Sequence, residues 1–330
     1  MEVAIVILNW NGRILLEKFL PSVVKYSKEA TIYVADNAST DDSVAFVSEN
    51  FPNIKIIQNS TNGGYAKGYN EALKGLSEEL FVLLNSDVEV TEGWLAPVIS
   101  EFKTDPLLVA AQPKILDYNK KEFFEYAGAA GGYIDQLGYP YCRGRIFNTL
   151  ERDEGQYNDI HKIFWATGAC LFVRNSAFKE VGGFDQDLFA HQEEIDLCWR
   201  LQANNGQIKS IGTSSIYHVG AATLKVSNPR KTFFNFRNTL LILVKNVKGV
   251  NIWGILFTRL ILDGIAGFQF LIQGKPAHTF AIIKAHCSFY TLLPKFIKKR
   301  RLVASNLKYF NIKSIVWKYF VNKGRIFNEL

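Results

Sequence analysis

The fold is decided by the stretch Phe81-Val82-Leu83-Leu84-Asn85-Ser86-Asp87-Val88-Glu89-Val90. Four apolar residues in a row, ended by a polar Asn-Ser-Asp turn, are typical of a buried strand in a parallel sheet. Asp87 then lies just beyond the carboxyl end of that strand, where open α/β sheets bind their ligands. A short carboxylate there, beside Asn85, suits a divalent cation that takes further ligands from substrate phosphates. The same residues also form ordinary turns, so this stretch alone supports both interpretations about equally.

The segments around this stretch alternate between strand and helix patterns. Apolar runs predict strands at residues 3–8, 31–35, 54–58 and 107–115. Helical spacing predicts helices at residues 13–26, 44–51, 65–76 and 94–102. This rhythm predicts right-handed crossovers and an α/β fold with a mostly parallel sheet.

Two common phosphate-binding sequences are missing from the chain. The first predicted strand is followed by Asn9-Trp10-Asn11-Gly12 instead of GxGxxG, and GxxxxGK[ST] does not occur. A dinucleotide dehydrogenase and a P-loop NTPase are therefore excluded as interpretations.

Residues 117–160 are rich in Gly, Tyr and Asp and follow neither a strand nor a helix pattern. A long excursion of this kind is more often a functional loop region than a linker. Its tyrosines could stack on sugar rings or simply pack in the interior, and they are Tyr126, Tyr133, Tyr139 and Tyr141. Beyond it we expect an apolar segment at 162–173 and strands at 208–211 and 216–219.

Helical spacing returns within residues 189–201, so that three carboxylates crowd the first turn of a helix. Acids favour a helix N-terminus, and Asp196 is spaced to pair with Arg200 at i,i+4, which accounts for Asp196. That explanation is weaker for Glu193 and Glu194, because adjacent like charges repel unless a cation or a catalytic task compensates.

Three other polar positions are open to a structural and a functional interpretation. Asp36 could accept hydrogen bonds from a nucleobase or ribose, although the residues alone favour an Asx turn or a helix cap. The turn that ends at Gly64 lets the backbone approach a ligand closely, or only turns tightly. His218, within the strand predicted at 216–219, is more often a structural histidine than a metal ligand.

Composition and charge divide the chain into two parts. Of its 330 residues 48% are hydrophobic, and the net charge is +7. Residues 1–230 carry 21 Lys and Arg against 29 Asp and Glu, whereas residues 231–330 carry 17 against 2. The acidic part is compatible with a metal-using catalytic domain, and the basic part with an anionic surface such as membrane lipid.

The cysteines and the first residues bear on the compartment. Cys142, Cys170, Cys198 and Cys287 are scattered without a CxxC pair, which indicates reduced cytosolic thiols and neither a disulfide framework nor a zinc site. The chain enters a strand pattern at Val3, so we expect no secretory signal.

Six segments in order resemble family 2 glycosyltransferases of the GT-A fold, particularly the bacterial rhamnosyltransferase-like group. They are Val3-Ala4-Ile5-Val6-Ile7-Leu8-Asn9-Trp10-Asn11-Gly12, Val34-Ala35-Asp36-Asn37-Ala38-Ser39-Thr40-Asp41, Asn62-Gly63-Gly64-Tyr65-Ala66, Leu84-Asn85-Ser86-Asp87, Thr167-Gly168-Ala169 and Glu193-Glu194-Ile195-Asp196-Leu197. The resemblance covers residues 1 to about 225. It implies a Rossmann-like GT-A domain with helices on both faces of the sheet, a nucleoside-diphosphate-sugar donor, and inversion at the anomeric carbon.

The resemblance also implies how the donor is bound. Asp36 would contact the base or ribose, and Asn9 and Gly64 would line the nucleotide site. Asp87 would be the metal-binding acid of the family's Asp-x-Asp motif, with Mg²⁺ or Mn²⁺ as the cation. This motif reads Asn85-Ser86-Asp87 here, so one anionic ligand is missing and we expect weak metal binding until the diphosphate arrives.

For catalysis the resemblance implies a carboxylate base that takes the proton of the acceptor hydroxyl. Glu194 matches the position of that base, where Asp is commoner, and Glu193 is its neighbour, so the choice between the two stays open. His218 falls where GT-A enzymes often place a later metal ligand.

The basic part predicts membrane contact. We place a catalytic domain at residues 1–228 and a helical, amphipathic extension at residues 229–330, in which Arg230, Lys231 or Arg237 could face phosphates or solvent. The apolar run 252–272 is long enough to span a bilayer, yet it carries Arg259 and Asp263, spaced to pair one turn apart.

We interpret 252–272, the apolar 276–293 and the basic run 295–301 as helices lying in the interface of an anionic membrane. Packing onto the catalytic domain or a partner chain, including a second copy, and a true span are the alternatives. Nucleic acid is a poorer partner, because the basic residues alternate with large apolar ones.

The sequence therefore predicts an inverting, metal-dependent glycosyltransferase, peripheral at the cytoplasmic face of the cell membrane, with a lipid-linked or cell-envelope glycan acceptor. One alternative is a sugar nucleotidyltransferase, which would require a Gly-rich basic sequence after the first strand that is not present here. The other is a non-catalytic membrane-associated scaffold that retains the fold.

Overall fold

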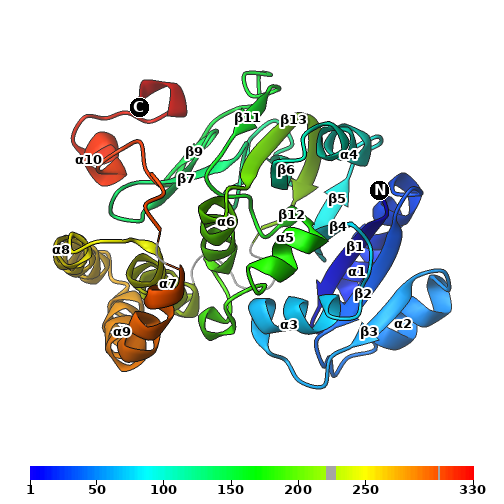
Figure 1. Ribbon diagram of the computed structural model, residues 1–330, viewed down its shortest axis with the longest axis horizontal. Coiled ribbons are helices and arrows are strands. Elements are labelled where there is room, and N and C mark those ends of the chain that lie inside the picture. Colours follow the sequence, from blue (N-terminus) through cyan, green and yellow to red (C-terminus); the bar gives the residue numbers. More distant parts are fainter. Residues whose placement is uncertain (221–227, 304) are drawn as a thin grey trace.

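The computed structural model describes residues 1–220, 228–303 and 305–330. The chain forms a large mixed sheet with helices on both faces, a small antiparallel sheet beside it, and a group of C-terminal helices (Figure 1). The predicted α/β class with a mostly parallel sheet and a helical C-terminal part is confirmed.

The large sheet has the strand order β11-β13-β6-β12-β4-β1-β2-β3, and β5 pairs with β13. Its strands are β1 (Val3–Asn9), β2 (Thr31–Asp36), β3 (Lys55–Gln58), β4 (Leu80–Asn85), β5 (Val88–Val90), β6 (Leu108–Asp117), β11 (Ile160–Lys162), β12 (Cys170–Arg174) and β13 (Gln207–His218). The pairs β3–β2, β2–β1, β1–β4 and β6–β13 are parallel, whereas β12 is antiparallel to β4 and β6. Strands β1, β2, β4 and β13 therefore end at the same edge of the sheet.

Alternate residues of the central strands feed two cores on opposite faces. In β1, Val6 lies in one core and Ile5 in the other, because successive side chains of a strand point to opposite faces. The Val6 face is covered by α3 (Gly64–Leu73), α5 (Asn175–Glu180) and α6 (Glu193–Ala203). The Ile5 face is covered by α1 (Arg13–Tyr26), α2 (Ser43–Asn50) and α4 (Leu95–Thr104). Burial on both faces explains why these strands read as continuous apolar runs.

The unassigned region 117–160 is partly ordered into the small sheet. Its strands are β7 (Gly132–Ile134), β8 (Pro140–Cys142), β9 (Arg145–Ile146) and β10 (Thr149–Leu150), which are too short to carry a sequence period. Tyr133 and Tyr141 stack on each other, and the ring of Tyr139 lies under Arg259, so these three tyrosines pack inside the protein. Tyr126 is 38% exposed, and its stacking on a ligand stays a prediction.

The two strands predicted at 208–211 and 216–219 are one strand, β13, which ends at His218. The register between β13 and β6 shifts between Ile211 and Ser215, and Gly212 lies in the interval. A bulge therefore interrupts the apolar pattern without ending the strand, which explains the error.

The C-terminal part consists of α7 (Pro229–Asn246), α8 (Ile252–Ile272), α9 (Pro276–Val303) and α10 (Ile315–Phe320), which lie together at the left of Figure 1. Helix α7 packs against α9 and α6 and buries Leu240 and Leu243 in the core that also holds α6. The proposed boundary at residue 228 remains a prediction. The family resemblance was drawn over residues 1 to about 225, of which 221–225 lie outside the described residues.

Helix α8 is held onto the small sheet by a buried polar cluster. Arg259 pairs with Asp263 at 3.2 Å, as their spacing predicted, and both side chains are almost fully buried. Arg259 also donates to the carbonyl of Leu137, and its guanidinium lies 3.8 Å from the ring centre of Tyr139. His286 of α9 reaches Asp263 at 3.1 Å.

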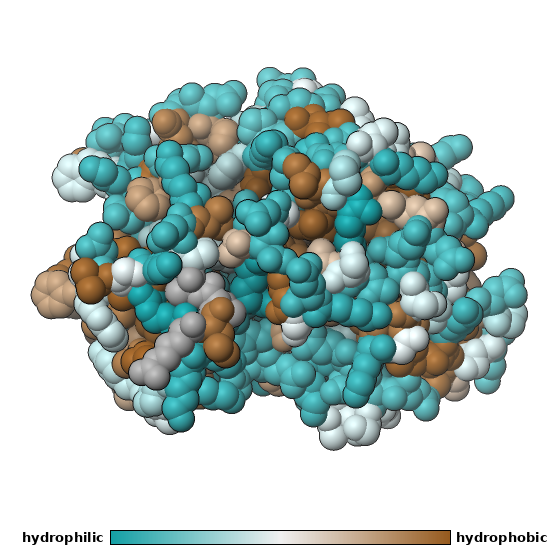
Figure 2. All heavy atoms as spheres, viewed as in Figure 1, coloured by the Kyte–Doolittle hydropathy of each residue, from teal (hydrophilic) through white to brown (hydrophobic). Residues whose placement is uncertain are grey.

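By length and composition alone, α8 is the one helix of the described residues that could cross a membrane, and 28% of its apolar window is buried. Its opposite side exposes an apolar row at helical spacing, called here the α8 stripe: Trp253, Phe257, Ile261, Ile265, Phe268 and Ile272. Figure 2 shows hydrophobic side chains at the left edge of the molecule, over α8.

Candidate active site

The polar residues predicted to bind the donor gather at one edge of the large sheet. Asn9, Asp36, Asn85 and His218 are the last residues of β1, β2, β4 and β13. Asp87 follows in the turn between β4 and β5. This is the carboxyl edge of the parallel strands, so the sequence prediction for the location of the acid is confirmed.

Asp87, His218 and Glu125 form a buried row, called here the Asp-His-Glu row. Nε2 of His218 lies 3.1 Å from Oδ1 of Asp87, and Nδ1 lies 3.3 Å from Oε2 of Glu125. All three residues are at most 5% exposed. Burial alone lowers the pKa of His218, but Glu125 and Asp87 outweigh it and raise the pKa to about 10. Without a cation, this histidine is an imidazolium between two carboxylates.

The Asp-His-Glu row could bind a divalent cation that takes only a few of its ligands from the protein. Among the described residues, no group of three or more acidic, His or Cys side chains converges on one point. Asp87 and Nε2 of His218 do face each other, and Glu125 lies against the other ring nitrogen. Carboxylates in this second position commonly orient a metal-bound histidine. Asn85 extends its amide to within 3.4 Å of the same Nε2. A cation here would need phosphate oxygens or water to complete its shell, as Mg²⁺ commonly does.

On the nucleotide side, Asn9 and Asp36 hold each other in place. Nδ2 of Asn9 donates to Oδ1 of Asp36 at 3.2 Å, and the backbone N–H of Ser39 donates to Oδ2 at 2.9 Å. The side chain of Asp36 is therefore engaged within its own turn, which agrees with a structural interpretation. Oδ1 of Asn9 is buried and has no partner among the described residues. The donor-binding roles of both residues remain predictions.

Gly64 has a positive φ of 74°, and a Cβ on it would lie 2.7 Å from the carbonyl oxygen of Phe189. The lack of a side chain at Gly64 therefore lets Phe189, in the segment before α6, pack closely against it. Its role in lining the nucleotide site is a prediction that the structure leaves open.

The candidate bases Glu193 and Glu194 begin α6. Glu193 is buried and Glu194 is partly exposed, and one carboxylate oxygen of each is enclosed without a partner among the described residues. Burial raises the pKa of Glu193 well above its ordinary value, and repulsion from Glu194 raises it further. Burial also raises the pKa of Glu194, to about 7. The adjacent pair that looked costly in the sequence is thus relieved by protonation.

A strained segment leads into these carboxylates. Phe189, His191 and Gln192 all have positive φ angles, between 66° and 69°, which residues other than glycine rarely adopt. Asn238 of α7 fixes the segment by donating to the carbonyls of Leu188, Ala190 and His191. Strain of this kind persists where the surroundings enforce it, and it is common near functional groups.

Asp196 has a structural role, as its spacing predicted. It pairs with Arg200 at 2.9 Å and with Lys245 of α7 at 2.8 Å, and it accepts from Asn246. These partners outweigh burial and lower the pKa of Asp196. The pairing ties α7 to α6 two residues after the candidate base Glu194.

Glu194 and Glu125 of the Asp-His-Glu row both act electrostatically on one buried thiol. Burial raises the pKa of Cys142, Arg145 opposes the shift, and the charges of Glu125 and Glu194 both add to it. The hydroxyl of Tyr65 donates to the carbonyl of Gly168, in the matched segment 167–169. Burial raises the pKa of Tyr65, and the charges of Glu193 and Glu194 raise it further. The six sequence segments therefore converge in space.

Sequence reasoning missed Glu125 and Arg145, because both lie in the region that showed no period. A signal was present in Glu125-Tyr126, an acid beside an exposed aromatic residue. Lys231 was named only as one of three basic candidates. Of the other two, Arg230 is exposed, while Arg237 donates to the carbonyls of Asp187 and Leu188 and is structural.

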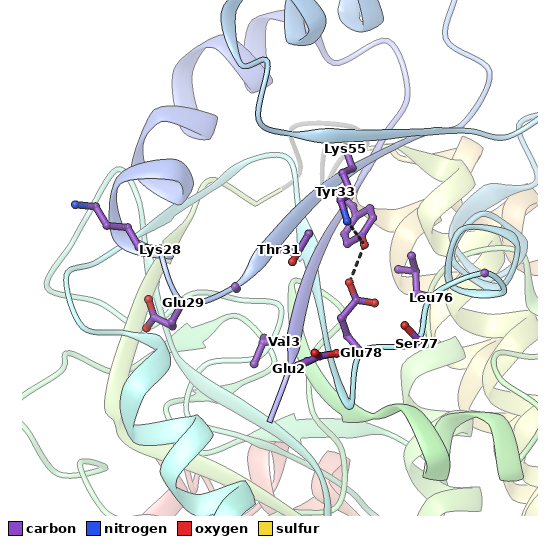
Figure 3. A pocket seen from close by; sticks show the side chains of 12 residues that line it. Glu2, Val3, Lys28, Glu29, Thr31, Tyr33, Lys55, Leu76, Ser77 and Glu78 are labelled. Atoms are coloured by element: carbon purple, nitrogen blue, oxygen red, sulfur yellow. Dashed lines mark hydrogen bonds between the residues drawn. The ribbon is translucent and has the colours of Figure 1, made fainter.

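A cavity elsewhere in the fold is separate from this site. It has a volume of about 520 Å³ and lies at the opposite, amino ends of the strands, where Tyr33 donates to Glu78 at 2.7 Å (Figure 3). A second cavity, of about 410 Å³, lies between the segment 181–187 and the lysines of α7 and α9. Neither cavity contains a residue of the Asp-His-Glu row or of the Glu193–Glu194 pair.

Comparison with known proteins agrees with this arrangement. Residues 4–182 match the family model described as Glycosyl transferase family 2. A relative from Mycobacterium tuberculosis, N-acetylglucosaminyl-diphospho-decaprenol L-rhamnosyltransferase, is 28% identical over 202 residues, which cover 56% of this chain and 66% of that protein, slightly under two thirds.

Two solved structures show the same GT-A fold. Staphylococcus aureus TarS 1–349 in complex with UDP-GlcNAc is 17% identical with a TM-score of 0.56, and the match covers 91% of this chain and 84% of that one. A mannosyltransferase from Pyrobaculum calidifontis, in complex with GDP-Man and Mn²⁺, is 14% identical with a TM-score of 0.52, over 92% and 84% of the two chains.

Proposed function

Since the chain belongs to glycosyl transferase family 2, we propose that it transfers a sugar from a nucleoside-diphosphate-sugar to a lipid-linked or cell-envelope glycan acceptor, with inversion at the anomeric carbon. The observation that carries this proposal is the buried acid-histidine row at the carboxyl edge of the sheet. A further carboxylate, Glu194 at the start of α6, has a pKa that burial raises to about 7.

Glu194 is the general base in this proposal. A pKa of about 7 is close to the value at which a base is both deprotonated at neutral pH and able to accept a proton. Burial and repulsion from Glu194 raise the pKa of Glu193 well above its ordinary value. We propose Glu194 as the base because it is the partly exposed member of the pair, with Glu193 as its buried neighbour.

Mg²⁺ or Mn²⁺ would be held by Asp87 and by Nε2 of His218, which must give up its proton to the solvent on binding. A bound cation would neutralise the charge that develops on the departing diphosphate. Glu125 keeps the imidazole ring oriented, and Asn85 lies against the same nitrogen. The inverting reaction needs no protein nucleophile, so the acceptor oxygen, deprotonated by Glu194, would attack the anomeric carbon directly.

The proposed acceptor is carried by a lipid at a membrane surface. The Mycobacterium tuberculosis relative bears the name of a lipid-diphosphate acceptor, and the α8 stripe offers an apolar face of the kind that lies in a membrane interface. Lys248, Lys275, Lys284 and Lys298 are exposed on the same C-terminal part and suit anionic lipid. We therefore propose a peripheral position at the cytoplasmic face.

Part of the basic run expected to contact lipid is used within the protein. Lys295 pairs with Asp187, Lys299 pairs with Asp185 and Asp187, and Arg300 donates to the carbonyls of Val244 and Gly249. Electrostatic attraction to lipid would therefore rest on the remaining exposed lysines and be modest.

The test is transfer of sugar to a short-chain prenyl-diphosphate-sugar acceptor, using donors selected by thermal stabilisation of the protein. The proposal expects a glycosylated lipid whose new bond has the anomeric configuration opposite to that of the donor. A product that retains the configuration would contradict the inverting mechanism. Nucleotide binding without any transfer would support the scaffold alternative, and formation of a sugar nucleotide from a sugar phosphate would support the nucleotidyltransferase.

A further inference from the structure

Two cations flank the exposed ring of Tyr126 beside the Asp-His-Glu row and have no task in the reaction described above. The guanidinium of Arg145, on β9, lies 4.7 Å from the ring centre. The ammonium of Lys231, in the first turn of α7, lies 5.6 Å from the same centre. Elements from two separate parts of the fold thus bring two positive charges to one aromatic side chain.

Arg145 is a buried charge without a counter-charge. The residue is only 5% exposed, its Nη2 donates to the thiol sulfur of Cys142 at 3.2 Å, and its Nη1 donates weakly to the carbonyl of Pro140. Its Nε is enclosed and has no partner among the described residues. Among the described residues, no carboxylate lies within ion-pair distance of Arg145 or of Lys231. Burial lowers the pKa of Arg145, but Cys142, Tyr126 and Glu125 outweigh it and raise the pKa, so what the enclosed Nε lacks is a hydrogen-bond acceptor, such as an anion.

Glu125 does not supply that anion. It is the acidic residue that acts electrostatically on both cations, but its Oε2 accepts from the backbone N–H of Ala127 at 2.6 Å and lies 3.3 Å from His218. Burial lowers the pKa of Lys231, Arg145 lowers it further, and Glu125 only partly opposes both. His191 shows the same excess of positive charge, since burial and Lys231 lower its pKa to about 4.

We propose that Arg145 and Lys231 bind a phosphate group of a substrate, with Tyr126 as the surface between them. The planar guanidinium can donate to phosphate oxygens with Nε and an Nη, and the lysine adds a point charge at close range. The N-terminus of the 18-residue helix α7, which carries Lys231, adds a partial positive charge to the same place.

This inference rests on the proposed function for the identity of the substrate. Both the nucleotide donor and a lipid-diphosphate acceptor carry phosphates, and the arrangement favours the acceptor. Asn9 and Asp36 lie at the ends of β1 and β2, whereas Lys231 stands on α7, which packs against α9 and so adjoins α8 and its exposed stripe. A lipid diphosphate has its phosphates between an apolar tail and a sugar, so in this proposal its phosphates lie at Lys231 and Arg145 and its tail extends toward the C-terminal helices.

The first experiment measures binding of inorganic pyrophosphate by calorimetry in the presence of EDTA, which removes any metal contribution. The full-length protein is compared with Lys231→Met and Arg145→Met, and Lys103→Met on the exposed face of α4 is the matched loss of one charge. We expect pyrophosphate affinity to fall at least tenfold in the first two variants and to be unchanged in the control. Unchanged affinity in Lys231→Met, or no pyrophosphate binding by the unsubstituted protein, would overturn the proposal.

This experiment is independent of turnover, so it can succeed even if the chain transfers no sugar. Because Arg145 is buried and its replacement could unfold the protein, Lys231→Met, which is partly exposed, decides the outcome if Arg145→Met is unstable.

The second experiment distinguishes the two phosphate sources. KM is measured in Lys231→Met for the nucleotide-sugar and for a short-chain prenyl-diphosphate-sugar acceptor. A tenfold rise in the acceptor KM alone supports the lipid acceptor as the source, and a rise in the donor KM alone supports the nucleotide. A fall in kcat with neither KM changed would overturn the phosphate-binding role.

Discussion

At the scale of single residues, two carboxylates with different environments carry the account. Asp87 contacts a protonated histidine and is suited to a cation, whereas Glu194 has little compensating charge and a pKa near 7. Separating the pKa values of acidic groups by environment is how one site provides both an electrostatic anchor and a base. Neither property can be read from the sequence, because one depends on His218, 131 residues away in the chain, and the other on burial in the folded protein.

Activity should depend on pH through Glu194. As pH falls through about 7, Glu194 becomes protonated and can no longer accept the proton of the acceptor, so kcat should fall about tenfold for each unit below that pH. Glu194→Gln should lower kcat at least about 100-fold and remove this dependence. If the kcat of Glu194→Gln still fell below about pH 7, that pH dependence would belong to another group.

Glu194→Gln should also change stability, in the opposite direction to activity. The folded pKa of Glu194 lies above its ordinary value of 4.5, so the folded protein binds more protons than the unfolded chain between pH 4.5 and 7. This group therefore makes the protein less stable as pH rises through that window. The variant should melt at a higher temperature than the unsubstituted protein at pH 8 and at a similar one at pH 4, as measured by calorimetry. A lower melting temperature at pH 8 would contradict the assigned pKa.

At the scale of elements, α8 has a buried polar face and an exposed apolar face. Its length and hydropathy suit a membrane span, but Arg259 and Asp263 attach one face to the small sheet and leave the α8 stripe on the other. The sequence gives the pairing of these two residues, since it is local in the chain. It cannot give Tyr139 and Leu137 as their partners, because those lie in the segment without periodicity.

Breaking the buried pair in α8 should be strongly destabilising. Arg259→Leu leaves Asp263 buried with only His286 and Tyr139 near it, and the expected loss is about 3–5 kcal/mol in urea unfolding. Replacing both residues, as Arg259→Met with Asp263→Leu, should cost much less, because no unpaired charge remains. If Arg259→Leu were neutral, the docked position of α8 would be wrong.

The α8 stripe should determine membrane binding. Phe257→Ser combined with Phe268→Ser removes two exposed aromatic side chains and should weaken binding to vesicles containing anionic lipid at least tenfold in sedimentation assays. Leu107→Ser, an equally exposed apolar residue of the catalytic part, serves as the control and should bind like the unsubstituted protein. Equal binding by all three proteins would exclude the stripe as the contact.

At the scale of the whole molecule, the sequence predicted the sheet and its carboxyl edge well. Strands buried on both faces give long apolar runs, and the acids at their ends fall at fixed places along the chain. The site was predicted only in part, since Glu125, Arg145 and Lys231 come from short strands, loops and a helix start that carry no period. The bulge in β13 was missed for a related reason, because a shift in register within a strand looks like a turn.

The central claim is that Asp87 and Glu194 serve one site with separate tasks. The most direct test measures, in one series, sugar transfer and Mn²⁺-dependent nucleotide affinity for Asp87→Ala, Glu194→Gln and the unsubstituted protein. The account predicts that both variants lose at least about 99% of transfer, and that only Asp87→Ala loses the metal-dependent affinity. Transfer near the unsubstituted rate in either variant, or loss of that affinity in Glu194→Gln, would contradict it.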